Sequence, residues 1–199
     1  VQLPTYFYIP NELYYSFGPQ LVKQINNQGG MEAINEALYQ LPTAEQIYEP
    51  EKYFSGEVYE NVIIEDLIVA DYNLVKEGTI GALDIPYILQ DTIGRGASVT
   101  AAIGLGGGAW KDYVNSSQQL MMSLKMTGDT PEDLEEIYNA YIAWANAQQR
   151  FTSVESFEGG TLYIGDTNVW ISNDGTYVRM LLTQDLEIFN EIITQMSRF

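Results

Sequence analysis

The side chains of this sequence that could do acid–base chemistry are its carboxylates. The chain has no histidine and no cysteine, so it lacks the usual ligands of a zinc site and the base of a nucleophilic triad. Paired carboxylates can cleave glycosides, but only at a defined separation in space that a sequence does not give. Four acids crowd one expected helix start, at Glu132, Asp133, Glu135 and Glu136. Because acids favour the first turn of a helix, we interpret them as a solvated face and predict no catalytic residue.

Two Gly-Asp-Thr tripeptides invite comparison with aspartic proteases, in which two such loops bring together carboxylates that share a proton. They contain Asp129 and Asp166. The protease loops continue with a small, flexible residue after the threonine, whereas these continue with Pro131 and Asn168. We therefore interpret both tripeptides as polar turns.

The densest glycine cluster, residues 104–109, matches a loose dinucleotide-binding pattern, G-x-G-x-x-A. Phosphate binding needs a strand before such a cluster and a helix start after it. Here a strand is expected after it, at 110–114, and the nearest preceding basic residue is Arg95. We interpret the cluster as a flexible turn or a site of close backbone packing, and we predict no cofactor and no metal.

Aromatic residues are frequent near the N-terminus, where they suit either a contact surface or core packing. Tyr6, Phe7 and Tyr8 are candidate assembly contacts, because residues 1–9 could add to the sheet edge of a neighbouring molecule. Asn115 begins the sequon Asn-Ser-Ser and is a candidate glycosylation site.

Two helices are expected to open the chain. Pro19 suits a first helical turn, and apolar residues follow at helical spacing until Gly29 and Gly30 interrupt them. A second helix is expected over 31–41, because Pro42 prevents the helix from continuing.

Helix starts are also indicated further along the first half. Thr43 and Gln46 have the spacing of a capping box, which predicts a single turn of helix. Asp84 can cap a helix that has Pro86 in its first turn. Between them, residues 58–70 are apolar and β-branched, but their periodicity does not distinguish a strand from a helix.

The second half alternates strands with helices. Strands at 110–114 and 120–126 are expected to be neighbours, and Thr130 with Pro131 begins a helix that runs to about residue 149. Three further strands at 162–164, 169–172 and 177–182, with a hairpin turn at 173–175, precede a last helix that begins at Thr183 or Asp185.

This order indicates an α+β fold with a helical N-terminal half and, in the C-terminal half, an antiparallel β-sheet with helices packed on one face. We expect a single domain over residues 1–199, with a possible subdivision into a mainly helical part, 1–103, and an α+β part, 104–199.

The charge balance limits the partners. The net charge of −18 comes from 27 acidic and only 9 basic residues, so nucleic acids and anionic membranes are excluded as expected partners. No stretch is long and apolar enough for a transmembrane segment. A surface of uncharged polar residues and tyrosines is typical of extracellular or cell-surface proteins, and the start at Val1 predicts a processed or trimmed chain. Few basic residues also suggest acid tolerance.

Residues 3–53 carry a resemblance to a known group of proteins. The features are 13–22 (LYYSFGPQLV), the Gly29-Gly30 break, and 42–53 (PTAEQIYEPEKY). Here the chain closely resembles a family of uncharacterised exported bacterial and archaeal proteins related to HExxH zinc metallopeptidases (zincin-like). The resemblance implies that the catalytic motif lies N-terminal to the part seen here. The family commonly has a histidine where this chain has Glu49, so no catalytic residue carries over.

Two functions from different classes follow. The first is a non-catalytic exported domain, either the C-terminal part of a metallopeptidase-like precursor or a degenerate relative, whose partner is the missing N-terminal half or another protein. The alternative is a subunit of an extracellular assembly such as a surface lattice or filament. A glycan-binding or glycan-cleaving module is a weaker alternative, since it rests only on acids and aromatics.

Overall fold

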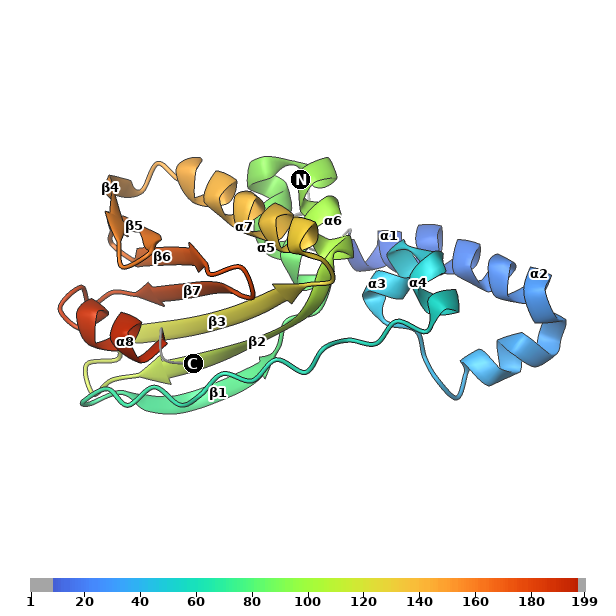
Figure 1. Ribbon diagram of the computed structural model, residues 1–199, viewed down its shortest axis with the longest axis horizontal. Coiled ribbons are helices and arrows are strands. Elements are labelled where there is room, and N and C mark those ends of the chain that lie inside the picture. Colours follow the sequence, from blue (N-terminus) through green and yellow to red (C-terminus); the bar gives the residue numbers. More distant parts are fainter. Residues whose placement is uncertain (1–8, 197–199) are drawn as a thin grey trace. The chain divides into compact units, whose positions relative to one another are not determined.

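The structure, a computed structural model, describes residues 9–196 (Figure 1). Its helices and its antiparallel sheet, which lies mostly in the C-terminal half, confirm the α+β class. The described residues form two compact units. The helical unit contains the chain up to Tyr59 and Gly81–Ile103, and the sheet unit contains Glu60–Ile80 and the chain from Gly104 onward. One boundary therefore coincides with the expected subdivision at 103/104, whereas residues 60–80 lie with the sheet.

The helical unit is built from short helices and one long, kinked helix. They are α1 (Ile9–Glu12), the π-helix η2 (Leu13–Phe17), α2 (Gly18–Ala37), α3 (Ala44–Tyr48), α4 (Pro50–Ser55), α5 (Asp84–Ile93) and α6 (Arg95–Ile103). Gly30 has φ +64° and ψ −152°, so α2 consists of two arms that meet at this residue. The predicted interruption at Gly29 and Gly30 is confirmed, but the second arm ends at Ala37 and not at residue 41.

The helix starts in this unit were predicted with mixed success. The capping box of Thr43 and Gln46 is confirmed, because each side chain accepts a hydrogen bond from the backbone N–H of the other. The prediction that Asp84 caps a helix was wrong. This residue lies inside the first turn of α5, and its Oδ2 accepts the N–H of Gly81 at 2.7 Å. Helix α6 was not predicted, since Gly94, at φ +85°, ends α5 without ending the helical segment.

Among the described residues the sheet unit has seven antiparallel strands, in the order β1-β2-β3-β7-β6-β5-β4. Its elements are β1 (Asn73–Thr79), β2 (Leu105–Val114), β3 (Leu120–Gly128), α7 (Pro131–Asn146), β4 (Phe151–Phe157), β5 (Gly160–Gly165), β6 (Asn168–Asn173), β7 (Val178–Thr183) and α8 (Phe189–Met196). The predicted pairing of the strands around 110–114 and 120–126 is confirmed, and β4 was not predicted.

Helices cover both faces of this sheet, so the expectation of helices on one face was wrong. The Tyr163 hydroxyl donates to Asn146 Oδ1 at 3.0 Å, which places the end of α7 on the face to which Tyr163 points. The neighbouring Leu162 points to the opposite face, where it shares a core cluster with Phe189 and Ile192 of α8. A single amphipathic helix cannot cover a face of seven strands, which leaves room for another segment.

That segment is an extended strap, residues 60–72, which crosses the α8 face and leads into β1 (Figure 1). Its buried side chains alternate with exposed ones, at Val62, Ile64, Leu67 and Val69. It is held largely through side chains. Tyr113 Oη accepts the N–H of Leu67 at 3.1 Å, and the Gln195 amide bonds both backbone groups of Ile68. The strap thus completes the core without joining the sheet.

Candidate functional site

The two aspartates of the Gly-Asp-Thr tripeptides do not form a dyad. Asp129 directly follows β3, and Asp166 directly follows β5, with β7 and β6 between these strands. Because successive strands are antiparallel, the C-terminal ends of β3 and β5 lie at opposite ends of the sheet. Both residues are exposed, and their place in the topology agrees with polar turns.

The acids around Glu132 serve the start of α7. Thr130 Oγ1 accepts the backbone N–H of Asp133 at 3.2 Å, and Asp133 Oδ2 accepts the backbone N–H of Thr130 at 3.1 Å. This is a capping box that places a carboxylate at the positive end of the helix. Glu132, Glu135 and Glu136 are exposed, as expected of a solvated face.

Gly104 directly precedes strand β2, the rest of the glycine cluster lies within the strand, and the cluster is a site of close backbone packing. A Cβ at Gly107 would overlap the backbone carbonyl of Glu60 in the strap, and one at Gly104 would overlap the Asp133 side chain. The Glu60 N–H donates to Gly106 O at 2.7 Å. The interpretation as close packing is confirmed, and the alternative of a flexible turn was wrong.

The remaining candidate residues have different positions. Asn115 lies at the end of β2 with 8% of its surface exposed, and its Nδ2 donates to Gln119 Oε1 at 2.8 Å. Since Nδ2 is the atom that would carry a glycan, attachment requires this hydrogen bond to break. Tyr6, Phe7 and Tyr8 lie outside the described residues, so their role in assembly stays a prediction.

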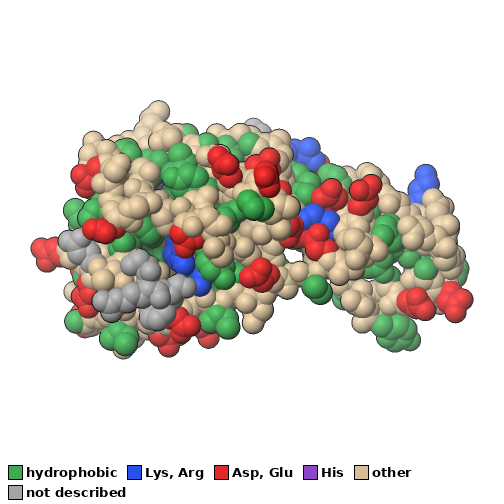
Figure 2. Space-filling view, viewed as in Figure 1, with side chains coloured by type: hydrophobic (Ala, Val, Ile, Leu, Met, Phe, Trp, Pro, Cys, Tyr) green, Lys and Arg blue, Asp and Glu red, His purple; other side chains and the backbone are tan. Residues whose placement is uncertain are grey.

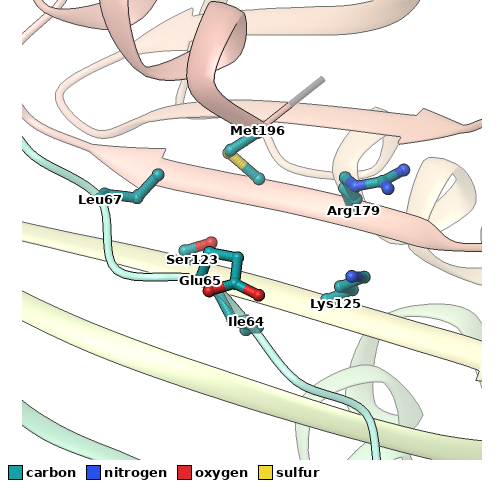
Figure 3. Close-up of a pocket in the computed structure, with 7 residues that line it drawn as sticks. All are labelled: Ile64, Glu65, Leu67, Ser123, Lys125, Arg179 and Met196. Carbon is teal, nitrogen blue, oxygen red and sulfur yellow. The ribbon is translucent and has the colours of Figure 1, made fainter. Parts of the chain in front are cut away.

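A small cavity in the sheet unit lies beneath the strap and is lined by basic, acidic, polar and apolar side chains (Figure 3). Lys125 of β3 and Arg179 of β7 are cross-strand partners, and Arg179 forms an ion pair with Asp174. Lys125 Nζ lies 4.2 Å from the centroid of the Tyr177 ring and donates to Ile63 O of the strap at 3.2 Å. Burial, followed by the charge of Arg179, lowers the pKa of Lys125.

A serine near a lysine of lowered pKa invites a nucleophilic interpretation. Ser123 also lines this cavity, and its buried Oγ has no hydrogen-bond partner in the structure. The cavity volume is only about 20 Å³, which suits one water molecule and no organic substrate. The ammonium of Lys125 holds the strap through its hydrogen bond to Ile63 O.

The helical unit contains an apolar groove between the two arms of α2. It has a volume of about 500 Å³, which lies within the range of ligand sites. Its lining comes from η2, both arms of α2, the loop that follows, and α3: Tyr14, Gly18, Pro19, Leu21, Val22, Ile25, Ile34, Ala37, Leu38, Leu41, Pro42 and Ile47. None of these side chains is charged, so the groove suits apolar groups.

The kink at Gly30 creates this groove. A continuous helix would separate residues 25 and 34 along one rod, whereas the turn at Gly30 brings the apolar faces of both arms to one cavity. The groove is incompletely filled by its own unit, because Val22 is 50% exposed and Leu38 is 66% exposed. Exposed apolar surface of this kind commonly marks an interaction site.

The π-helix η2 forms one end of the groove. The N–H of Gly18 bonds Leu13 O, five residues back, so the segment contains one residue more than an α-helical turn. Leu13 is buried, and Tyr14 and Tyr15 are exposed. Phe17 is held by an edge-on contact with Tyr48, at 5.1 Å between ring centroids. Tyr14 of the π-helix lines the groove, and the contact between Phe17 and Tyr48 holds the π-helix in place.

Arg95 and Glu12 form an ion pair within the same unit. Arg95 Nη2 lies 2.6 Å from Glu12 Oε1, and the guanidinium lies 5.9 Å from the ring centroid of Phe17. Burial, followed by the charge of Glu12, raises the pKa of Tyr48. These contacts fix η2 against α3 and α6, and none of them involves the apolar lining of the groove.

Comparisons with known proteins add no relative: no family model, curated protein or solved structure matches the chain. The resemblance to zincin-like exported proteins therefore stays a prediction. Glu49, which stands where that family commonly has a histidine, lies between α3 and α4, and its side chain makes no capping hydrogen bond. The sequence predicted the helices that line the groove but not the groove itself. The available signal was the number of apolar residues on these helices, some of which, such as Leu38 and Leu41, are not buried in the core.

Proposed function

We propose that this chain is a non-catalytic exported domain that binds another polypeptide through the groove of its helical unit. The observation that supports the proposal most is the groove itself, which is apolar, uncharged and partly exposed. A buried helix face in a completed core would not leave Leu38 and Leu41 exposed at 66% and 75%. A groove between amphipathic helices is a common recognition surface for apolar peptide segments.

The rest of the surface supports this choice of partner. The net charge is −18, and Figure 2 shows carboxylates spread over the visible face among uncharged residues, with few basic side chains. A surface of this kind repels anionic polymers. No helix within residues 9–196 is long and apolar enough to cross a membrane. The ligand that fits the groove is therefore an uncharged, apolar polypeptide segment.

The proposal is tested with a defined probe. The probe is a nine-residue peptide with blocked ends that contains aromatic and aliphatic residues and no charge, and its control has two of these residues replaced by Asp. On titration into the full chain, we expect the uncharged peptide to shift the methyl NMR signals of Ile25, Ile34 and Ile47, which line the groove. The methyl signals of Ile171 in β6 should not move. Equal shifts with both peptides, or none with either, would contradict the proposal.

A second candidate function is a subunit of an extracellular assembly. Strand β4 favours it, because it is an edge strand whose seven residues carry a single charge, Glu155. Edge strands of natural sheets are usually protected by charges, and the other edge strand carries both Lys76 and Glu77. An extended segment of a neighbouring molecule could pair with β4. In that case Val154→Glu, at a position 55% exposed, should prevent assembly without unfolding the monomer.

A further inference from the structure

We propose that the groove of the helical unit binds the aromatic segment of residues 1–8 from a second copy of this chain. The inference rests on the proposed function and names its partner. It is drawn from the composition of the segment, from the position at which the segment joins the described chain, and from the dimensions of the groove.

The segment and the groove have matching chemistry. Residues 1–8 read VQLPTYFY, and the first charged residue of the chain is Glu12. The groove lining contains no charged side chain either. In a chain of net charge −18, an uncharged segment avoids the repulsion that other surface segments of a second copy would meet. Three consecutive aromatic residues also provide large apolar area at a small cost in side-chain entropy.

The groove is the better receptor for this segment than a sheet edge. Pro4 has no N–H to donate and its φ is fixed, so it interrupts the hydrogen bonding of a strand added to β4. Binding in a groove requires side-chain contacts, and an extended conformation with proline is compatible with it. From Tyr14 to Ile25 the groove runs along about 16 Å of helix, at 1.5 Å per residue. About five residues of extended chain cover this length.

The geometry favours a second copy over the segment's own chain. Residues 9–29 follow one continuous helical path through α1, η2 and the first arm of α2. A segment that precedes this path must reverse its direction to lie along the groove of its own unit, and a tight reversal takes about four residues. Tyr6, Phe7 and Tyr8 directly precede Ile9, so the reversal would consume them. In a second copy all three aromatics are available.

The test measures the association of the full chain by sedimentation velocity over a range of concentrations. Phe7→Glu alters the segment, and Val22→Glu alters the groove at a position that is half exposed. Val154→Glu is the matched control, since Val154 is similarly exposed but lies on the β4 edge. We expect the unmodified chain and the control to associate with the same concentration dependence, and each of the other two variants to remain monomeric.

Mixing the two defective variants gives the sharpest result. Phe7→Glu retains an intact groove and Val22→Glu retains an intact segment, so an equimolar mixture should associate although neither variant does so alone. If the mixture stays monomeric, or if only Val154→Glu prevents association, the inference is wrong. A monomeric unmodified chain, with Phe7→Glu lowering its melting temperature independently of concentration, would instead assign the groove to its own segment.

Two further measurements keep the result interpretable. Circular dichroism establishes that each variant is folded, and Leu38→Gln, at a more exposed position of the same groove, replaces Val22→Glu if that variant unfolds. The uncharged probe peptide separates the two proposals. If it shifts the groove methyl signals while the full chain never associates, the groove binds polypeptides but not this segment.

Discussion

At the scale of single residues, two aspartates of the sheet unit have opposite environments. Asp112 is partly buried in β2, and one of its carboxylate oxygens has no hydrogen-bond partner; burial raises its pKa, partly offset by Lys76. Asp174 lies in the β6–β7 turn. Burial alone would raise its pKa, but the hydrogen bonds from Arg179, Tyr177 and Thr176 outweigh burial and lower it. The first carboxylate therefore destabilises the fold in its charged form, and the second stabilises it.

For Asp112→Asn we expect a higher free energy of unfolding at pH 7, by about 1 kcal/mol. The raised pKa means that the folded state holds its proton to a higher pH than the unfolded state does, so stability is lost as pH rises through the folded pKa. Asparagine does not ionise, so the variant does not lose this stability at pH 7. Urea unfolding at pH 7 and pH 3 checks it: the advantage of the variant should shrink at pH 3, and an equal advantage at both values would refute the role of ionisation.

Asp174→Ala should lower the free energy of unfolding at pH 7 by about 1–2 kcal/mol, because it leaves the buried Arg179 without its ion pair and two turn N–H groups without an acceptor. Because the pKa of Asp174 is lowered, its contribution to stability depends on pH in the opposite direction to that of Asp112. The contribution is complete above the unfolded value of 3.8 and disappears as pH falls through the folded pKa. Urea unfolding should therefore show wild type and variant converging at low pH.

At the scale of elements, two segments have forms that their own residues specify only in part. The two arms of α2 depend on one glycine, since φ +64° with ψ −152° is a conformation that residues with a Cβ rarely adopt. The strap depends on partners far away in the sequence. Leu67 bonds Tyr113 and Ile68 bonds Gln195, so its conformation is fixed by the sheet face and α8 and not by neighbouring residues.

Gly30→Ala should lower the free energy of unfolding by about 1–3 kcal/mol, the usual cost of such strain, and should weaken binding of the uncharged peptide because the arms no longer meet at the same angle. Gly96→Ala is the matched control. Gly96 lies in α6 with open space around its Cα and ordinary helical φ, so alanine there should stabilise by up to about 1 kcal/mol. Thermal unfolding and peptide titration of both variants give the answer.

Tyr113→Phe should loosen the strap without unfolding the sheet. The phenyl ring keeps the packing of a side chain that is 1% exposed, but the N–H of Leu67 loses its acceptor, at a cost of about 1–2 kcal/mol. Hydrogen exchange should become faster in residues 62–70, while amides paired between β2 and β3 keep their wild-type rates. Uniformly faster exchange in both regions would mean that the variant lowers global stability instead.

At the scale of the whole molecule, charge sets the response to solution conditions. At pH 7 the chain carries −18, and when its 27 carboxylates are protonated only its 9 basic residues remain charged. The self-repulsion that destabilises most proteins in acid is therefore limited here. The opposite shifts of Asp112 and Asp174 also offset one another in acid.

We predict that the chain remains folded at pH 4, as the hypothesis of acid tolerance requires. Far-ultraviolet and near-ultraviolet circular dichroism between pH 7 and pH 2 is the measurement. Loss of the near-ultraviolet signal by pH 4 would rule the hypothesis out, since it would show that ion pairs such as Lys111 with Asp66, at 2.5 Å, carry much of the stability.

The sequence was sufficient where structure is local. The capping box at Thr43, the helix start at Thr130, the interruption at Gly30 and the hairpin at residues 173–175 follow from residues within a few positions of one another, and all are present. Strand β4 was missed because most of its side chains are exposed on both faces, which removes the alternation that identifies a strand.

The strap and the groove were not predicted for a different reason. The strap has apolar residues at strand spacing, but its hydrogen-bond partners lie 46 and 127 residues away in the sequence. The groove of the helical unit requires two helix arms to face each other, and periodicity gives the apolar face of each arm without its direction. Both features depend on tertiary geometry that no local pattern encodes.

The glycine run in β2 has a consequence for how relatives of this chain would be recognised. Gly107 cannot carry a side chain, because the strap's backbone passes directly over it. In any set of homologous sequences this glycine should then be among the least variable positions, whereas the surface acids, which outnumber the basic residues, should vary more. A motif search would score that invariance as evidence for a nucleotide cofactor. Here the constraint comes from one backbone crossing another, so invariance would report architecture and not chemistry.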